Sequence, residues 1–84
     1  CPGCAPEVAL AENNLALLRM RQRRYDDAGT LLAHAVALRE SFTAAPGAEL
    51  AGTLNLLAEV REKQNRHRDA EQLKQRAGVI LAYR

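Results

Sequence analysis

The chain has 84 residues and a formal net charge of +2, and 48% of its residues are apolar, 4% aromatic and 26% charged. This length fits one small domain, and an apolar fraction supplied largely by Ala and Leu is typical of packed amphipathic helices. The charge is too mild to require a nucleic acid partner. A run of about 18 apolar residues, which a membrane-spanning helix needs, does not occur.

The first half of the chain predicts two helices, at about residues 7–22 and 25–41, after an N-terminal leader of residues 1–6. Pro6 stands where a helix start tolerates proline, and the acidic Asp26 suits the first turn of the second helix. Apolar residues recur at helical spacing in both segments. They are Val8, Ala11, Leu15 and Leu18 in the first, and Tyr25, Ala28, Leu31, Leu32, Ala35 and Leu38 in the second.

The second half predicts two more helices, at about residues 48–64 and 67–83. Residues 42–47 contain the helix breakers Pro46 and Gly47 and form the connection. The apolar residues of the later helices are Leu50, Leu54, Leu57 and Ala58, then Ala70, Leu73, Ala77, Ile80 and Leu81. Short connections make sequential helices antiparallel, so the chain is predicted to be all-α, with two helical hairpins.

Identical residues recur with a shift of 42 positions, which places residues 1–42 over 43–84. The matched pairs include Glu7/Glu49, Ala9/Ala51, Asn13/Asn55, Ala16/Ala58, Arg19/Arg61, Gln22/Gln64, Arg24/Arg66, Asp27/Asp69, Ala28/Ala70, Leu31/Leu73 and Ala35/Ala77. Self-similarity at a fixed period indicates a stacked helical array in which each unit covers the next. Residues 7–41 and 48–84 are the predicted units, and their shared alanines fall where helix backbones must approach closely.

The residues that carry a family resemblance run from Ala5 to Ala9, Asn13 to Ala16 and Gln22 to Ala28 with Ala35, and again from Leu54 to Ala58 and Gln64 to Ala70 with Ala77. This pattern resembles the tetratricopeptide repeat, in the 42-residue form found in kinesin light chain. The family usually has Gly at the left-handed turn between paired helices, where this chain has Arg23 and Asn65. At the usual aromatic position stand Arg19 and Arg61, whose stems are expected over the core with their head groups in water.

The resemblance implies a concave groove lined by the first helix of each hairpin. Its residues would be Leu10, Asn13, Leu17, Met20 and Arg21 in the first copy, and Gly52, Asn55, Glu59, Glu62 and Lys63 in the second. Asn13 and Asn55 fit two roles: they hold the backbone of an extended peptide, or they bridge neighbouring helices. The family's carboxylate clamp is not matched, because Asn13 and Leu17 stand where Lys and Asn would be required.

Basic residues gather at the two turns between paired helices. They are Arg19, Arg21, Arg23 and Arg24 at the first turn, and Arg61, Lys63, Arg66 and Arg68 at the second. Stacked copies would place both turns on one basic edge. This edge fits an anionic partner, such as an acidic protein, a membrane surface or nucleic acid, or it reflects the ordinary preference of cations for helix C-termini. Nucleic acid is disfavoured because no aromatic residue interleaves the basic run.

No arrangement typical of catalysis, metal binding or cofactor binding is found, so we expect neither an enzyme nor a cofactor. His34 and His67 are interpreted as isolated surface histidines. Cys1 and Cys4 form a CxxC pair with several interpretations: a redox pair, half of a zinc site, or an acylated Cys1 of a bacterial lipoprotein. A fourth interpretation is an excised fragment. A fragment would be cytoplasmic, and an acylated chain would be anchored in the cell envelope.

The last predicted helix ends in an apolar run. Val79, Ile80, Leu81 and Tyr83 would present an uncovered face there. Repeat arrays usually need such a face covered, so a partner protein or a second copy is expected on it. The function favoured by the sequence is an adaptor that binds a peptide segment or docks as a small subunit of a larger assembly. The alternative is an electrostatic module that uses the basic edge, with a membrane as partner only if Cys1 is acylated.

Overall fold

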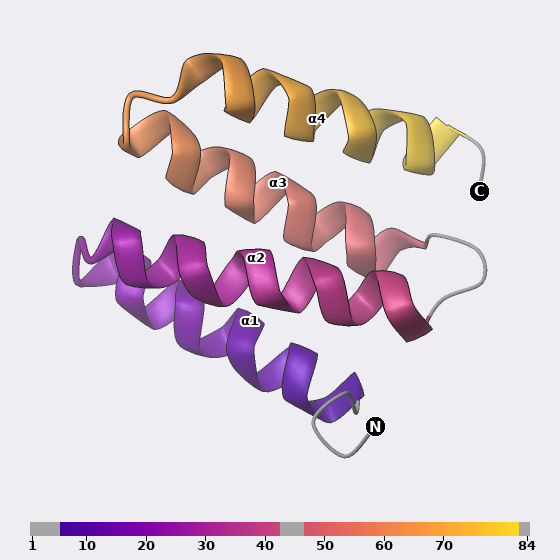
Figure 1. Ribbon diagram of the computed structural model, residues 1–84, viewed down its shortest axis with the longest axis horizontal. Coiled ribbons are helices and arrows are strands. Elements are labelled where there is room, and N and C mark those ends of the chain that lie inside the picture. The colour runs from indigo at the N-terminus through magenta and orange to yellow at the C-terminus, as the bar shows by residue number, and fades with distance from the viewer. Residues whose placement is uncertain (1–5, 43–46, 83–84) are drawn as a thin grey trace.

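The computed structural model describes residues 6–42 and 47–82, which form four helices. They are α1 (Pro6–Arg21), α2 (Tyr25–Phe42), α3 (Ala48–Lys63) and α4 (His67–Ala82). The helices lie side by side in chain order, with α1 against α2, α2 against α3, and α3 against α4 (Figure 1). No strand occurs in these two ranges. The all-α prediction is therefore confirmed, and helix ends within the described residues agree to one position.

The two hairpin turns have the same backbone geometry. Arg23 and Asn65 adopt positive φ angles of 61° and 62°, which is the left-handed conformation expected where the family has glycine. In the first turn, the amide of Arg24 donates to the carbonyl of Arg19 at 2.8 Å and the amide of Arg23 to Met20 at 3.0 Å. The same two hydrogen bonds recur in the second turn. This is the Schellman motif, which satisfies carbonyl groups that a helix end would leave open.

Alanines permit close packing within and between the hairpins. All eight alanines that the copies share are at most 1% exposed: Ala9, Ala16, Ala28, Ala35, Ala51, Ala58, Ala70 and Ala77. A larger side chain at such a position forces the helices apart or strains them, at a cost of about 1 to 3 kcal/mol. The repeated alanines thus fix the spacing of the helices.

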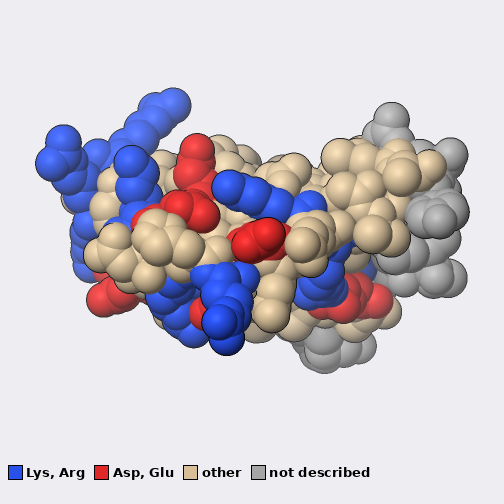
Figure 2. Space-filling model, turned by 90° about the horizontal axis from the view of Figure 1, so that it is seen from above, with Lys and Arg blue, Asp and Glu red and all other residues tan. Residues whose placement is uncertain are grey.

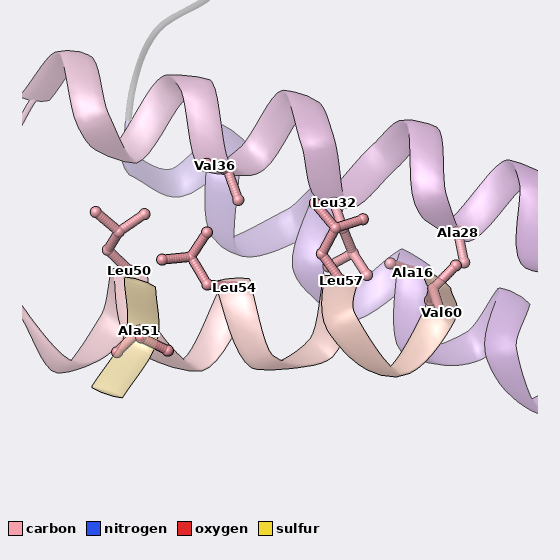
Figure 3. Close-up of a cluster of buried hydrophobic side chains, with 10 residues drawn as sticks. Ala16, Ala28, Leu32, Val36, Leu50, Ala51, Leu54, Leu57 and Val60 are labelled. Carbon is pink, nitrogen blue, oxygen red and sulfur yellow. The ribbon is translucent and has the colours of Figure 1, made fainter. Parts of the chain in front are cut away.

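The main apolar core lies between α2 and α3 (Figure 3). From α2, Leu32 and Val36 point towards α3, where they meet a row of buried apolar residues. That row is Leu50, Leu54, Leu57 and Val60. Burying a Leu or Val side chain contributes about 1.5 to 3 kcal/mol. The contact between the two hairpins is therefore the main hydrophobic contribution to the stack.

Gly29 of α2 lies buried at the end of this contact. A Cβ atom there would stand 3.0 Å from Nη1 of Arg61 and 3.5 Å from Cγ1 of Val60. The guanidinium of Arg61 therefore occupies the space that a side chain would take, and it also donates to Oε1 of Gln64 at 2.7 Å. The head group of Arg61 therefore lies against Gly29 of α2 and Gln64 of the second turn, and the side chain is half-buried.

None of the described helices combines the length and the apolar character needed to cross a membrane.

Candidate protein-binding groove

The first helices of the two hairpins are joined by a side-chain hydrogen bond. The hydroxyl of Thr53, on α3, lies 3.2 Å from Oδ1 of Asn13 on α1 and 3.1 Å from the carbonyl oxygen of Glu49. Thr53 is buried and Asn13 is half-buried. Asn13 thus makes the bridging contact that was one of its two predicted roles. Asn55 is exposed, and no hydrogen bond of its side chain is found among the described residues.

A cleft of about 250 Å³ begins beside this bridge and is lined by Glu7, Leu10, Arg39 and Glu49. Three helices contribute: α1, α2 and α3. Leu10, a predicted groove residue, is 54% exposed at the cleft wall. The cleft therefore continues the predicted groove towards the start of α1 and α3.

Arg39 is the one basic side chain of this cleft, and the sequence had not singled it out. Its side chain is only 14% exposed, its Nη1 lies 3.5 Å from Oε2 of Glu49, and its Nε is buried without a hydrogen-bond partner. A buried donor without an acceptor is costly. Its match in the second copy is Leu81, so the two copies do not share a polar residue at this position.

The other predicted groove residues divide between surface and core. Leu17 is 38% exposed on α1. Met20 packs against the apolar core. It lies four residues after the buried Ala16, so the two side chains share one face of α1. Among the remaining predicted groove residues, Glu62 is half-buried. The others are exposed: Arg21, Gly52, Asn55, Glu59 and Lys63. The exposed residues of this predicted set include the apolar Leu10 and Leu17 on α1, and the charged Glu59 and Lys63 on α3.

Glu62 is held by the turn that follows it. The Nδ1 atom of His67 lies 2.8 Å from its Oε2, and Nζ of Lys74 lies 3.8 Å from its Oε1. The hydrogen bond from His67 lowers the pKa of Glu62 from its ordinary value of 4.5; burial opposes this effect, and the charges of His67 and Lys74 add to the lowering. Glu62, a predicted groove residue, therefore pairs with side chains of the second turn and of α4.

The two histidines are exposed, as predicted, but they are not isolated. His67 pairs with Glu62, and His34 of α2 pairs with Glu12 of α1. The second pair is 22 residues apart in sequence, so only the packing of α1 on α2 brings it together. One oxygen of Glu12, Oε1, is buried without a partner.

Both hairpin turns lie on one edge of the molecule (Figure 1). Seen from above, Lys and Arg gather at that end, with acidic side chains among them (Figure 2). Arg24 pairs with Asp27, and Arg66 with Asp69, each at 2.7 Å. These pairs offset part of the positive charge of the predicted basic edge.

The turns are also linked to each other. Nε2 of Gln64 donates to Oδ1 of Asp26 at 2.7 Å, which connects the second turn to the start of α2. An open depression of about 520 Å³ lies beside this bond, and Arg23, Arg24, Asp26, Asp27, Tyr25, Lys63 and Gln64 line it. Acidic and basic groups face it together, so it has no single sign of charge.

The predicted apolar face of α4 is present in part. Val79 and Leu81 are 58% and 44% exposed, and Ile80 packs partly against the core. Tyr83, Cys1 and Cys4 lie outside the described residues. Within residues 6–42 and 47–82, no group of three or more His, Cys, Asp or Glu side chains is placed to hold a metal ion.

Two comparisons with known proteins bear on this geometry. A search of curated proteins returned no match. The family model described as tetratricopeptide repeat matches residues 7–77, which include both left-handed turns and all eight shared alanines. The match does not distinguish the 42-residue, kinesin-light-chain-like form, which stays a prediction. The chain belongs to the tetratricopeptide repeat family, whose non-catalytic repeats generally mediate protein–protein interaction.

Proposed function

We propose that the chain is an adaptor that binds an extended segment of a partner protein in the groove between α1 and α3. The groove offers an apolar wall at Leu10 and Leu17, and a polar floor at Asn13. A side-chain amide both donates and accepts hydrogen bonds, so it suits a peptide backbone of any sequence. Apolar walls with a few placed polar groups are typical of binding sites.

The observation that carries this proposal is the state of Arg39. Its side chain is mostly buried at the cleft, and its Nε has no acceptor. Its ion-pair partner within the described residues is Glu49, whose side chain is 88% exposed and whose Oε2 lies 3.5 Å from Nη1 of Arg39. A carboxylate from a bound peptide would supply two acceptors in the geometry that a guanidinium prefers. We therefore expect peptides with an acidic residue beside apolar residues.

Selection from a library of random peptides displayed on phage tests this function. Enriched peptides should carry Asp or Glu next to a large apolar residue, and they should shift the amide resonances of Leu10, Asn13 and Arg39 in NMR titrations. Arg39→Leu should weaken binding at least tenfold, whereas Arg39→Lys, which keeps the charge, should weaken it less.

Substitutions elsewhere separate this function from the alternatives. Asn13→Ala and Asn55→Ala should weaken binding in the groove. Charge reversal at the turns, for example Arg23→Glu with Arg66→Glu, should leave it unchanged; loss of binding there would favour the electrostatic module instead. Peptides whose binding is lost only with Val79→Ser would favour docking through α4. Either result contradicts the groove.

A further inference from the structure

The cleft beside Arg39 carries charges of both signs. Its lining consists of Glu7 and Leu10 from α1, Arg39 from α2 and Glu49 from α3. The side chain of Glu49 is 88% exposed and Glu7 is exposed as well, whereas only 14% of the Arg39 side chain is exposed. Two carboxylates are therefore open to solvent at a cleft whose guanidinium is mostly buried.

This side of a first helix stays open when hairpins stack. Glu7 and Leu10 on α1 match Glu49 and Gly52 on α3. Although α3 packs against α2 of the first hairpin, both Glu49 and Gly52 are exposed. The exposure of Glu7 and Leu10 is therefore a property of the repeat and not of their position in the first hairpin.

An acidic ligand residue that reaches Arg39 also meets Glu49. Because Nη1 of Arg39 lies 3.5 Å from Oε2 of Glu49, a carboxylate that pairs with the guanidinium comes close to a second carboxylate. Like charges placed together at an interface weaken binding. The Arg39–Glu49 pair itself is open to exchange, because ion pairs with a well-exposed partner contribute little to stability. A ligand that also brings a cation would offset the repulsion and give Glu49 a new partner.

We propose that the cleft selects peptide segments in which Lys or Arg stands within two residues of the acidic residue. This inference rests on the proposed function and adds a requirement to it. The carboxylate of the segment pairs with Arg39, its cation pairs with Glu49 or Glu7, and an apolar neighbour contacts Leu10. Side chains two residues apart in an extended chain share one face and lie about 7 Å apart, a distance that a Lys or Arg side chain spans.

Glu49 has the larger part in this selection. It is the carboxylate that gives up Arg39 when the acidic residue binds, and Glu7 has no printed contact with Arg39 to lose. Glu49 is thus a specificity-determining residue: it leaves binding through Arg39 possible, and it decides which charge is favoured next to the acidic residue.

The peptide selection described above gives the first test. Enriched peptides should carry Lys or Arg within two residues of Asp or Glu more often than the starting library does. Enriched peptides that contain the acidic residue without this basic neighbour would overturn the inference.

A double-mutant cycle on one selected peptide gives the second test, with fluorescence anisotropy as the measurement. Replacing the basic residue of the peptide by Ala should weaken binding to the unmodified chain about three- to fivefold, and less at high salt. Glu49→Gln should lose most of this difference. The matched control is Glu71→Gln, an exposed residue of α4, which does not line the cleft. This control should keep the full difference.

The Ala-substituted peptide separates charge selection from a structural role of Glu49. It keeps the acidic residue, so Glu49→Gln should bind it more tightly than the unmodified chain does. Weaker binding of both peptides by Glu49→Gln would overturn the inference, and so would an equal effect of the basic residue in both proteins. The proposed function fails differently: no peptide would bind, or Arg39→Leu would leave binding unchanged.

Discussion

The two hairpins have the same turns and the same buried alanines, but their outer surfaces differ. The face of α2 that meets α3 is small and apolar at Gly29, Leu32 and Val36, whereas the matching face of α4 is polar and exposed. The first helices differ as well. Leu57 and Val60 of α3 are buried, whereas Leu15 and Leu18, at the matching positions of α1, are exposed. The repeat thus fixes backbone geometry, and the position of each copy in the stack decides what its surfaces contact.

The largest change in the free energy of unfolding should come from truncating matched leucines of α3 and α1. Leu57→Ala removes a side chain that is 5% exposed, and core truncations of this kind cost about 2 to 4 kcal/mol. Leu15→Ala, at the matching position of α1, is 39% exposed and should cost about 1 kcal/mol or less in dilute monomer. Urea unfolding followed by circular dichroism gives both values. Equal costs would mean that α1 is as well covered as α3.

Making α4 resemble α2 should create a new contact. Lys74→Leu with Gly78→Val copies the apolar residues of α2 onto an exposed face. The exposed Leu15 and Leu18 on α1 of another molecule could then stack on it, and such head-to-tail contacts grow into open chains. Light scattering should detect a mean mass that rises with concentration to several times that of the unmodified chain at the same concentration. Lys74→Gln alone serves as the control and should not associate in this way.

The two matched asparagines should differ in stability. Asn13→Ala removes the hydrogen bond with Thr53 between α1 and α3 and should cost about 1 kcal/mol. Asn55→Ala alters an exposed side chain and should change the free energy of unfolding by less than about 0.5 kcal/mol. Chemical denaturation of both variants measures the difference. Comparable losses would show that Asn55 also has a structural role.

Glycine at the left-handed turns should stabilise the first hairpin more than the second. Arg23 holds a φ of 61°, a conformation that costs ordinary residues about 1 kcal/mol or more. Arg23→Gly should therefore raise stability by about 0.5 to 1 kcal/mol, net of the flexibility that glycine adds to the unfolded chain. Asn65→Gly should gain only a few tenths, since Asn tolerates this region. Melting temperatures rank the two variants, and a destabilised Arg23→Gly would contradict the reasoning.

The smallest effect concerns acid stability. Because the folded-state pKa of Glu62 lies below its ordinary value of 4.5, the unfolded chain binds the proton first as the pH falls. The contribution of Glu62 is present above about pH 4.5 and is lost as the pH falls through the lowered pKa. Glu62→Gln should lower the melting temperature slightly above about pH 4.5, and the two proteins should converge once the pH lies below the lowered pKa. If the difference in melting temperature between the two proteins grew as the pH fell, the pKa of Glu62 would be raised on folding and not lowered.

Much of the fold could be predicted from the sequence. The 42-residue self-match located both hairpins, and the spacing of apolar residues placed each helix end to within one residue of the structure. The left-handed turns at Arg23 and Asn65 followed from family position and not from residue type. These features are local or periodic, so a single sequence records them.

The details of the groove were harder to predict because they depend on contacts between residues distant in sequence. Thr53 meets Asn13 40 residues away, and Thr53 matches Ala11 in the first copy, so the repeat gave no signal. Arg39 matches Leu81 and was hidden for the same reason. The contact of the Arg61 head group with Gly29 could not be predicted either, because Gly29 belongs to the other hairpin. At positions where the two copies carry different residues, the repeat does not predict which contacts those residues make.

The hydroxyl of Thr53 has a consequence for ligand binding. It has one proton and two acceptors within reach, the Asn13 amide oxygen and the Glu49 carbonyl. If an incoming peptide amide claims the Asn13 oxygen, the hydroxyl can rotate fully towards its own helix and lose no hydrogen bond. When a peptide amide replaces the Thr53 hydroxyl at the Asn13 oxygen, the hydroxyl therefore keeps its hydrogen bond to the Glu49 carbonyl. The peptide can bind without breaking the packing between the two hairpins.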